Sequence, residues 1–256
     1  MPQPDTCVPL RIFVIGDSLA LPRETASIRY RDSYPFLIQQ SLNARLAPRF
    51  VPIVYDRSRP CLTLPDVVRR WDEEIAIQDP DVVVIHAGVV DCAPRVFTPF
   101  QRRVLTHLRP KAVRTAILRL VRRYRRQLVT LRGGMTYSTL DEFRSAAMAI
   151  SERVAHQGLR ACFFVSILSP PPTLEYRSPG FAQNVVMYNA VLDEAAQNGG
   201  IQVVSMNELV QTYGYERVVL DDGIHISQFG HAVLAAALSL RIAQAVTEER
   251  SILTVG

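Results

Sequence analysis

The chain has 256 residues, of which 48% are hydrophobic, and a formal net charge of +5 at pH 7. A domain of this length buries roughly 70–75% of its unfolded surface, so it needs no disulfide staples. Secreted and membrane classes are disfavoured, because Met1–Asp5 is polar and broken by proline, the four cysteines are scattered, and no apolar run approaches the ~20 residues of a membrane span. We therefore expect one cytoplasmic domain over residues 1–256.

Apolar runs and helical periodicities alternate along the chain. Short runs rich in β-branched residues predict strands at residues 11–16, 50–55, 82–85, 159–168 and 201–204. Helical patterns, two of them opened by capping-box spacings, are found at residues 33–46, 63–78, 112–132, 139–157, 182–197 and from about 228 onward. This alternation predicts a flavodoxin-like, three-layer α/β/α sandwich with a mainly parallel sheet of about five strands.

A strongly basic insert interrupts the alternation at about residues 95–135. Between Asp91 and Asp141 the sequence has no acidic residue but twelve Lys and Arg, which leaves 17 of the 29 basic residues to balance the 24 acidic ones. The centre of the insert, residues 112–132, has the pattern of one amphipathic helix. An apolar arc lies opposite a basic arc that includes Arg119, Arg122, Arg123, Arg125 and Arg126.

Three interpretations of this helix are open. It packs on the body with a solvated arginine face, which is the commonest arrangement of such a stripe. Alternatively, it docks on an anionic membrane surface or another polyanion, which would place the protein peripherally at the inner membrane surface. Nucleic acid ranks last as a partner, because no stacking aromatic residues or known binding motif accompany the arginines.

Candidate catalytic residues lie near the two ends of the chain. Ser18 directly follows the first predicted strand, in Gly16-Asp17-Ser18-Leu19, and ligands bind beyond the carboxyl ends of strands in open α/β sheets. Downstream, Asp222 precedes His225 by three residues. A serine needs a base to take its proton, a histidine suits that role, and an aspartate orients the imidazole. We therefore expect a Ser18–His225–Asp222 triad; the alternative for Ser18 is an ordinary turn serine.

These two blocks resemble those of the SGNH/GDSL family of serine esterases and acyl-transfer enzymes. The resemblance spans nearly the whole chain, because Gly16–Leu19 and Asp222–His225 lie near its two ends. It implies that Ser18 is the nucleophile and His225 its base. In that family two middle blocks supply a glycine and an asparagine to the oxyanion hole, and in this sequence both blocks are altered.

The altered blocks affect the oxyanion hole to different degrees. Cys61 aligns with the family's glycine, and because a backbone N–H donates whatever its side chain, this change affects geometry rather than chemistry. In His86–Asp91, Gly88 fits the pattern, but Val90 occupies the asparagine position. Losing one such donor costs roughly 10²–10³ in turnover. The resemblance thus implies backbone donors at Ser18, Cys61 and Gly88, with one side-chain donor missing.

Several polar residues are candidates for binding substrate or replacing that donor. They are Asp17, Arg59, Asp91, Arg95, Asn184 and Asn189. An arginine in this role would favour a substrate that is itself anionic. The spacing of Cys61, Cys92 and His225 does not match a zinc site, so we expect no metal and no cofactor.

The sequence supports two functional hypotheses. The first is an SGNH-type serine hydrolase or acyltransferase that removes or transfers a small O-acyl group, with acetyl on a carbohydrate or activated sugar as the leading candidate. The segment Gly88–Arg95 also resembles SGNH-like proteins of bacterial surface-polysaccharide pathways, which suggests a glycan ester. The second is a catalytically silent SGNH fold that binds a glycan or a biosynthetic partner, an alternative kept open by Val90.

Overall fold

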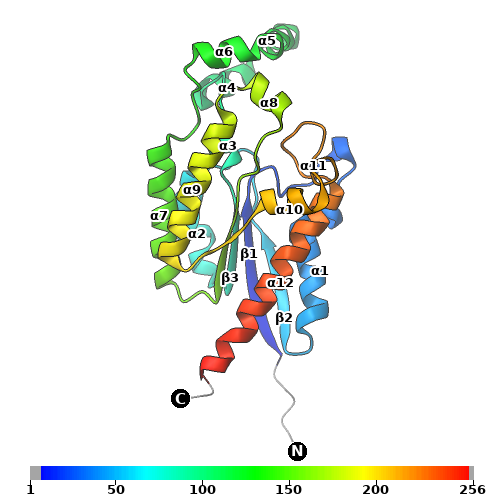
Figure 1. Ribbon diagram of the computed structural model, residues 1–256, viewed down its shortest axis with the longest axis vertical. Helices are drawn as coiled ribbons and strands as arrows, with labels where there is room; N and C mark the ends of the chain where they lie inside the picture. Colours follow the sequence, from blue (N-terminus) through cyan, green and yellow to red (C-terminus); the bar gives the residue numbers. More distant parts are fainter. Residues whose placement is uncertain (1–6, 254–256) are drawn as a thin grey trace, which may run out of the picture.

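The computed structural model describes residues 7–253, with side chains described as far as residue 248, so the polar start Met1–Asp5 lies outside the described residues. Five parallel strands form one sheet in the order β2-β1-β3-β4-β5 (Figure 1). They are β1 (Val8–Gly16), β2 (Phe50–Asp56), β3 (Val82–His86), β4 (Ala161–Val165) and β5 (Gln202–Val204). The predicted mainly parallel sheet is confirmed.

Helices cover both faces of the sheet and complete the predicted three-layer sandwich. On one face lie α2 (Leu64–Glu74), α7 (Leu140–His156) and α9 (Phe181–Gly199); on the other lie α1 (Tyr34–Leu46) and α12 (Gln228–Leu253). Alternation along β1 divides the core between the faces, since Phe13 packs with the first group of helices and Val14 with the second. Every residue of β3 is buried, as expected for a central parallel strand.

Shorter elements connect these layers and shape the carboxyl edge of the sheet. They are the helices α3 (Val89–Cys92), α4 (Pro99–His107), α5 (Lys111–Arg123), α6 (Arg125–Leu131), α8 (Pro172–Arg177), α10 (Met206–Tyr213) and α11 (Tyr215–Val218), and the 3₁₀ turns η1 (Glu24–Ala26), η2 (Tyr30–Asp32) and η3 (Ala76–Gln78). Both capping boxes predicted from sequence, at Thr63 and Thr139, are formed.

Among the described residues, one helix is long and apolar enough to cross a membrane when judged by length and composition alone, at Gln228–Glu248 within α12. This differs from the expectation from sequence that no apolar run approaches the length of a membrane span. In the fold, Leu234, Leu238 and Ile242 of this helix are fully buried against the sheet and α1. Its apolar character is therefore that of a core helix.

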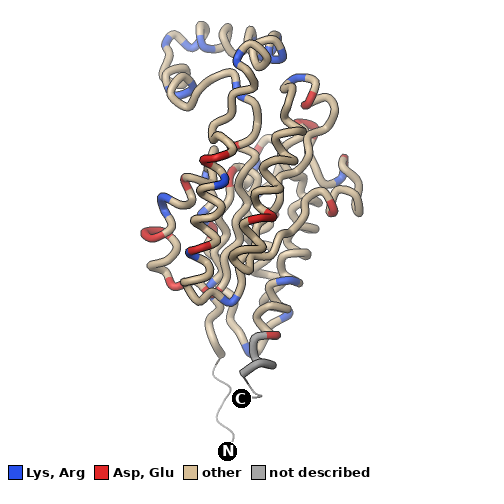
Figure 2. The backbone as a smooth tube through the Cα atoms, turned by 60° about the vertical axis from the view of Figure 1, so that its left-hand side comes forward, with Lys and Arg blue, Asp and Glu red and all other residues tan. Residues whose placement is uncertain are grey.

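The basic insert differs from its prediction. The helix expected over residues 112–132 is two helices, because the backbone leaves helical geometry at Tyr124, between α5 and α6. Only α6 is anchored through its apolar side, with Val129 buried. None of the residues of α5 is buried. The interpretation in which the whole amphipathic helix packs on the body is therefore wrong for α5. Figure 2 shows Lys and Arg concentrated on this end of the molecule.

Candidate active site

Ser18, His225 and Asp222 form a hydrogen-bonded series at the carboxyl end of β1. The Ser18 Oγ lies 3.0 Å from the His225 Nε2, and the His225 Nδ1 lies 2.7 Å from the Asp222 Oδ2. The second oxygen of Asp222 accepts hydrogen bonds from the backbone N–H groups of Ile224 and His225, at 3.0 and 2.9 Å. These bonds hold the carboxylate in place. The carboxylate in turn favours the tautomer of His225 whose Nδ1–H donates to Asp222, which leaves Nε2 free to accept from the serine.

Local electrostatics prepare this series for proton transfer. Burial lowers the pKa of His225 below its ordinary value, although the hydrogen bond and charge of Asp222 act in the opposite direction. Burial alone would raise the pKa of Asp222, but the backbone hydrogen bonds from His225 and Ile224 lower it overall. The aspartate is therefore ionised and the imidazole neutral near pH 7. A neutral imidazole beside a serine hydroxyl is the state that a general base requires.

A cavity of about 340 Å³ opens beside the triad, and we call it the catalytic pocket. Ser18 and His225 line it together with Cys61, Val90 and Arg95. Its other lining residues are Arg23, Pro60, Val89, Ala93, Arg102, Arg125, Leu174, Ser178, Phe181 and Ile224. The volume lies at the small end of ordinary ligand sites. It therefore suits a small acyl group better than a long chain.

The three predicted oxyanion donors are free to donate. Within the described residues, the backbone N–H groups of Ser18, Cys61 and Gly88 have no protein acceptor. Cys61 has a φ of 62°, a left-handed conformation that favours glycine and explains why the family has glycine there. Gly88 has a φ of 130°, and a Cβ on it would lie 2.6 Å from the Ile167 Cδ1. Only glycine fits at that position.

Arg95 lies beside the position where the family has its asparagine. Its Nη2 donates to the Val90 backbone oxygen at 3.1 Å, and its guanidinium lies over the Tyr137 ring at 4.7 Å. Its buried Nε has no hydrogen-bond partner within the described residues. Both Arg95 and Val90 line the catalytic pocket. Arg95 therefore brings a charged side chain to the wall of the cavity that lost the neutral donor.

Two predicted substrate-binding carboxylates are structural. Asp17 is fully buried, accepts from the Leu19 backbone N–H at 2.8 Å, and has its pKa raised to about 7 by burial. Asp91 is also fully buried, where it accepts from the Leu64 N–H and the Ser138 hydroxyl, and burial raises its pKa to about 6. Neither lines the catalytic pocket. Their prediction as substrate ligands is wrong, because both satisfy backbone and loop donors.

The other polar candidates are mostly structural as well. Asn189 exchanges two hydrogen bonds with the backbone of Ile167, each 2.8 Å long. Asn184 donates to the Cys92 backbone oxygen at 2.8 Å. Arg59 pairs with Glu74 on the surface, at 2.9 Å. None of these three lines the catalytic pocket, so only Arg95 of the six candidates reaches it.

Sequence reasoning missed two pocket residues in the basic insert. Arg102 comes from α4 and Arg125 from the start of α6. Arg125 had been placed on the solvated side of one long helix. The break at Tyr124 turns it inward, where it donates to the Ser178 Oγ at 2.8 Å and the Pro94 oxygen at 3.0 Å. The long run without acidic residues was the available signal for this basic pocket wall.

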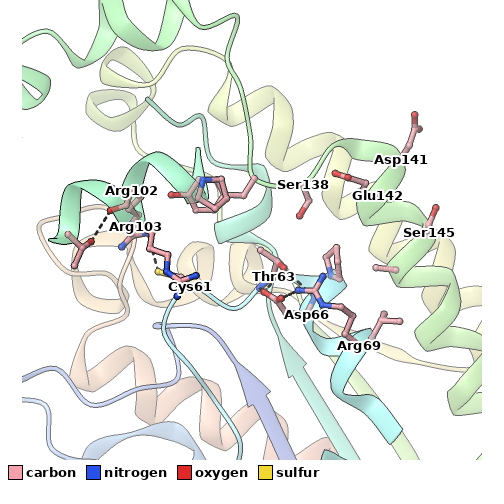
Figure 3. Close-up of a pocket in the computed structure, with 16 residues that line it drawn as sticks. Cys61, Thr63, Asp66, Arg69, Arg102, Arg103, Ser138, Asp141, Glu142 and Ser145 are labelled. Carbon is pink, nitrogen blue, oxygen red and sulfur yellow. Dashed lines mark hydrogen bonds and ion pairs between the residues drawn. The ribbon is translucent and has the colours of Figure 1, made fainter. Parts of the chain in front are cut away.

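A larger cavity of about 1020 Å³, the outer cavity, adjoins the catalytic pocket (Figure 3). The two share Cys61 and Arg102, and the Arg102 Nη1 lies 3.1 Å from the Cys61 Sγ. Its walls come from the start of α2, from α4 and from α7. Its polar lining includes Thr63, Asp66, Arg69, Arg103, Thr106, Ser138, Asp141, Glu142 and Ser145. Across residues 7–248 no cluster of three His, Cys, Asp or Glu is placed to hold a metal ion.

The chain is similar to known acyl hydrolases in sequence pattern and in fold. The model of the GDSL-like Lipase/Acylhydrolase family matches residues 14–233. No curated protein matches the chain by sequence. The structure resembles the lipase/acylhydrolase from Enterococcus faecalis, with 16% identity, coverage of 92% of this chain and 96% of the other, and a TM-score of 0.64.

Two further structures extend this likeness. One is LAE5, an alpha/beta hydrolase enzyme from the metagenome of Lake Arreo, with 16% identity, 93% and 97% coverage and a TM-score of 0.62. The other is Axe2, an acetylxylan esterase from Geobacillus stearothermophilus, with 17% identity, 93% and 96% coverage and a TM-score of 0.61. At these identities the structural likeness shows the fold, whereas the family match covers most of the chain. The protein therefore belongs to the GDSL-like lipase/acylhydrolase family.

Proposed function

We propose that the protein is a serine esterase that removes a small O-acyl group, with acetyl as the leading candidate, from a carbohydrate or activated sugar. The observation that carries the proposal is the hydrogen-bonded series from Ser18 through His225 to Asp222 at a cavity of about 340 Å³. Membership of an acylhydrolase family supports the reaction class. The small catalytic pocket supports a short acyl group.

The reaction follows from the positions of the donors and acceptors. The Ser18 Oγ attacks the acyl carbonyl carbon while the His225 Nε2 takes the hydroxyl proton, and Asp222 stabilises the imidazolium that forms. The free N–H groups of Ser18 and Cys61 are available to the oxyanion, and Arg95 supplies the charged donor that replaces the family's asparagine. His225 then protonates the departing sugar oxygen, which leaves an acyl-enzyme on Ser18.

The second half of the reaction uses the same groups. His225 takes a proton from water, whose oxygen attacks the acyl carbon and releases the carboxylic acid from Ser18. A second sugar hydroxyl in place of that water would give acyl transfer instead. The outer cavity shares Cys61 and Arg102 with the catalytic pocket, which supports the outer cavity as the side from which an acceptor would approach the acyl-enzyme.

The carbohydrate assignment is supported by the outer cavity. Its lining mixes hydroxyl, carboxylate and guanidinium groups, which match the donors and acceptors of sugar hydroxyls. Its volume of about 1020 Å³ is at the upper end of ordinary ligand sites. Axe2, one of the structures that the fold resembles, is an acetylxylan esterase.

Labelling with a fluorophosphonate probe tests the proposal most directly. We expect covalent labelling of the wild-type protein and none of Ser18→Ala, together with release of acetate from acetylated oligosaccharides by the wild type alone. The competing function is a silent SGNH fold that binds glycan, which Val90 favours because it removes a donor. Absence of both labelling and acetate release from a folded wild-type protein would decide for that alternative.

A further inference from the structure

The catalytic pocket is strongly basic. Arg23, Arg95, Arg102 and Arg125 line it, and no Asp or Glu does. Arg23 approaches a carboxylate outside the lining, since its Nη1 lies 4.0 Å from the Asp222 Oδ2. Among the described residues the other three have no carboxylate within ion-pair distance. Three arginines therefore face one small cavity without a protein counter-charge.

These arginines are held in place by uncharged groups. Arg125 donates to the Ser178 hydroxyl and the Pro94 carbonyl, and Arg102 contacts the Cys61 sulfur. The Arg95 guanidinium rests on the Tyr137 ring. Each contact fixes the direction of a guanidinium while leaving its charge intact. Donors that are already oriented lose little entropy when a ligand binds.

Arg95 lies close enough to Arg102 and to Arg125 for their charges to repel, whereas Arg102 itself is exposed and its interaction with Tyr137 raises its pKa. Burial lowers the pKa of Arg95, and the charge of Arg102 adds to that effect. Burial likewise lowers the pKa of Arg125, with further contributions from Arg95 and Arg177. Like charges held together away from water are unfavourable unless an opposite charge joins them. An anion entering this pocket would relieve the repulsion.

We propose that Arg95, Arg102 and Arg125 form an anion-binding subsite of the catalytic pocket, so that the preferred ester carries a carboxylate or phosphate close to its acyl group. The inference rests on the proposed esterase function and names the substrate class of that site. Guanidinium groups bind carboxylate and phosphate oxygens through paired, charge-assisted hydrogen bonds. Because Ser18 and His225 line the same cavity, the anionic group and the scissile ester belong to one small part of the substrate.

Three matched esters test this subsite. The first is an O-acetylated neutral hexose. The second is the corresponding O-acetylated uronate, and the third is the O-acetylated hexose that also carries a phosphate group. We expect kcat/KM to be at least about tenfold higher for a charged ester than for the neutral one, the size of one charge-assisted hydrogen bond. The uronate and phosphate arms show which anion is preferred. The advantage should shrink as salt is raised.

Variants locate the effect in the pocket. Arg102→Gln and Arg125→Gln should each reduce the ratio of charged to neutral kcat/KM by about tenfold. Arg119→Gln, on the exposed surface of α5, is the control and should keep the wild-type ratio. Circular dichroism melting identifies any variant that has not folded. The wild-type substrate ratio and its salt dependence do not depend on any variant, and equal cleavage of all three esters at every salt concentration would overturn the subsite.

Binding to Ser18→Ala separates this inference from the proposed function. Calorimetry with the deacetylated sugar phosphate and with the deacetylated uronate should show that each binds to Ser18→Ala. The double variant Ser18→Ala/Arg102→Gln should bind each of them about tenfold more weakly. If no ester is cleaved but this binding is found, the esterase proposal fails and the anion subsite stands. If esters are cleaved without charge preference, and the two anions do not bind, the subsite fails and the esterase stands.

A second surface, formed by α4 and α5, carries an independent inference. None of the residues of these two helices is buried. Large apolar side chains on them are 45–74% exposed: Phe100, Val104, Val113, Leu118 and Leu120. Phe100 and Val104 share one side of α4, and Val113 and Leu120 share one side of α5, at about 100° per residue. Large exposed apolar side chains on one side of a helix indicate a contact with another apolar phase. Figure 1 shows α5 at the end of the molecule opposite the start of β1 and the C-terminal end of α12.

The same α4–α5 surface is densely cationic. Residues 99–123 contain eight Lys and Arg and no acidic residue. Arg102 and Arg103 line the cavities described above, and the other six are Arg109, Lys111, Arg114, Arg119, Arg122 and Arg123. Within the part of the chain that the structure describes, none of them forms an ion pair with a carboxylate. An anionic bilayer offers both phosphate groups for the arginines and an acyl boundary for the apolar side chains.

We infer that the α4–α5 surface docks on anionic lipid bilayers. The apolar side chains distinguish this partner from nucleic acid, which would need only the positive charge and stacking groups. Flotation with vesicles of phosphatidylcholine, alone or mixed with phosphatidylglycerol, tests it. We expect binding only to the mixed vesicles, and release at high salt, because electrostatic attraction supplies much of the affinity.

Two kinds of variant separate charge from apolar insertion. Combined reversal of Arg119, Arg122 and Arg123 to Glu should abolish vesicle binding, and Val113→Ser with Leu120→Ser should weaken it at least about fivefold. Arg45→Glu and Ile77→Ser change exposed residues elsewhere and are the matched controls. Undiminished vesicle binding by the reversal variant overturns the inference. So does binding of the wild type to heparin or nucleic acid with none to mixed vesicles.

Discussion

The Arg95 Nη2 donates to the backbone oxygen of Val90 at 3.1 Å, so a guanidinium lies beside the residue that takes the place of the family's asparagine. The neutral amide that the family has at position 90 is absent, and the charged Arg95 side chain lines the same cavity. A guanidinium donates from several N–H groups, and the Arg95 Nε is still without a partner among the described residues. This relationship makes the altered oxyanion hole testable.

Restoring the family's residue should show whether Arg95 has replaced it. We expect Arg95→Ala to lower kcat by more than about tenfold, toward the 10²–10³ lost with an oxyanion donor. Val90→Asn in the wild type should change kcat little, because the donor is already supplied. In the Arg95→Ala background the same change should recover most of the loss. A large gain from Val90→Asn in the wild type would contradict this assignment. The measurement is turnover of a neutral acetyl ester.

The triad should behave as one unit. Ser18→Ala and His225→Ala should each remove most activity, roughly 10⁴-fold or more, because neither group works without the other. The double variant should then lose little beyond either single one, since the shared step is already gone. Single-turnover release of acetate measures these differences. Multiplicative losses in the double variant would show that the two residues act separately.

Gly88 lies in the loop after β3 that leads into Val90 and Arg95. Gly88→Ala combines a φ of 130°, which L-residues rarely adopt, with a Cβ only 2.6 Å from the Ile167 Cδ1. We expect the free energy of unfolding to fall by about 1–3 kcal/mol, measured by urea denaturation. Gly134→Ala is the control, because its φ of 68° is also positive but no atom lies within 4 Å of an added Cβ. Equal destabilisation by both would remove the steric part of this argument.

The sequence predicted the sheet and the triad because each has a local signature. β-Branched apolar runs mark buried parallel strands, and the Ser18 and Asp222–His225 blocks directly follow elements whose order the fold fixes. The polar site residues have no such signature. Asn189 and Asp91 looked like ligands, yet each satisfies backbone groups inside the protein. A sequence does not reveal which side of a loop an Asn or Asp side chain faces.

The basic insert shows a second reason for failure. Helical periodicity runs through residues 112–132 without a glycine or proline to mark the break at Tyr124. The break accompanies tertiary contacts, because Arg125 donates to Ser178 and to Pro94, which both lie outside this helical segment. The period therefore placed Arg125 on the solvent side, whereas it lines the catalytic pocket. Only the excess of positive charge was visible beforehand.

The pH dependence of esterase activity should follow His225. The neutral imidazole is the active form, so kcat/KM should fall as pH decreases through the His225 pKa and stay level above it. Burial holds this pKa below the ordinary value, and the Arg23 charge contributes in the same direction. Arg23→Gln should therefore shift the acid limb of the profile to higher pH. Arg45→Gln, on α1, is the control. A limb that does not move in Arg23→Gln would exclude that electrostatic contact.

Asp17 should make the protein less stable as pH rises toward neutrality. Burial raises the pKa of Asp17 from 3.8 to about 7, so the folded state keeps a proton that the unfolded chain releases. Its contribution to stability is complete below about pH 4 and is lost as pH rises through about 7, at up to about 1.4 kcal/mol per pH unit. Other groups titrate in the same range, notably His86, whose pKa burial lowers to about 3 and whose effect has the opposite sign.

A comparison of wild type with Asp17→Asn isolates that contribution. The amide keeps an oxygen to accept from the Leu19 N–H and cannot ionise, while terms from His86 are common to both proteins. We expect the unfolding free energy of Asp17→Asn relative to wild type to increase from pH 5 to pH 8, as measured by urea denaturation at each pH. Asp193→Asn, on the exposed side of α9, should show no such trend. A constant difference between Asp17→Asn and wild type across this range would mean that the Asp17 carboxyl is already ionised in the folded protein, and would contradict the raised pKa.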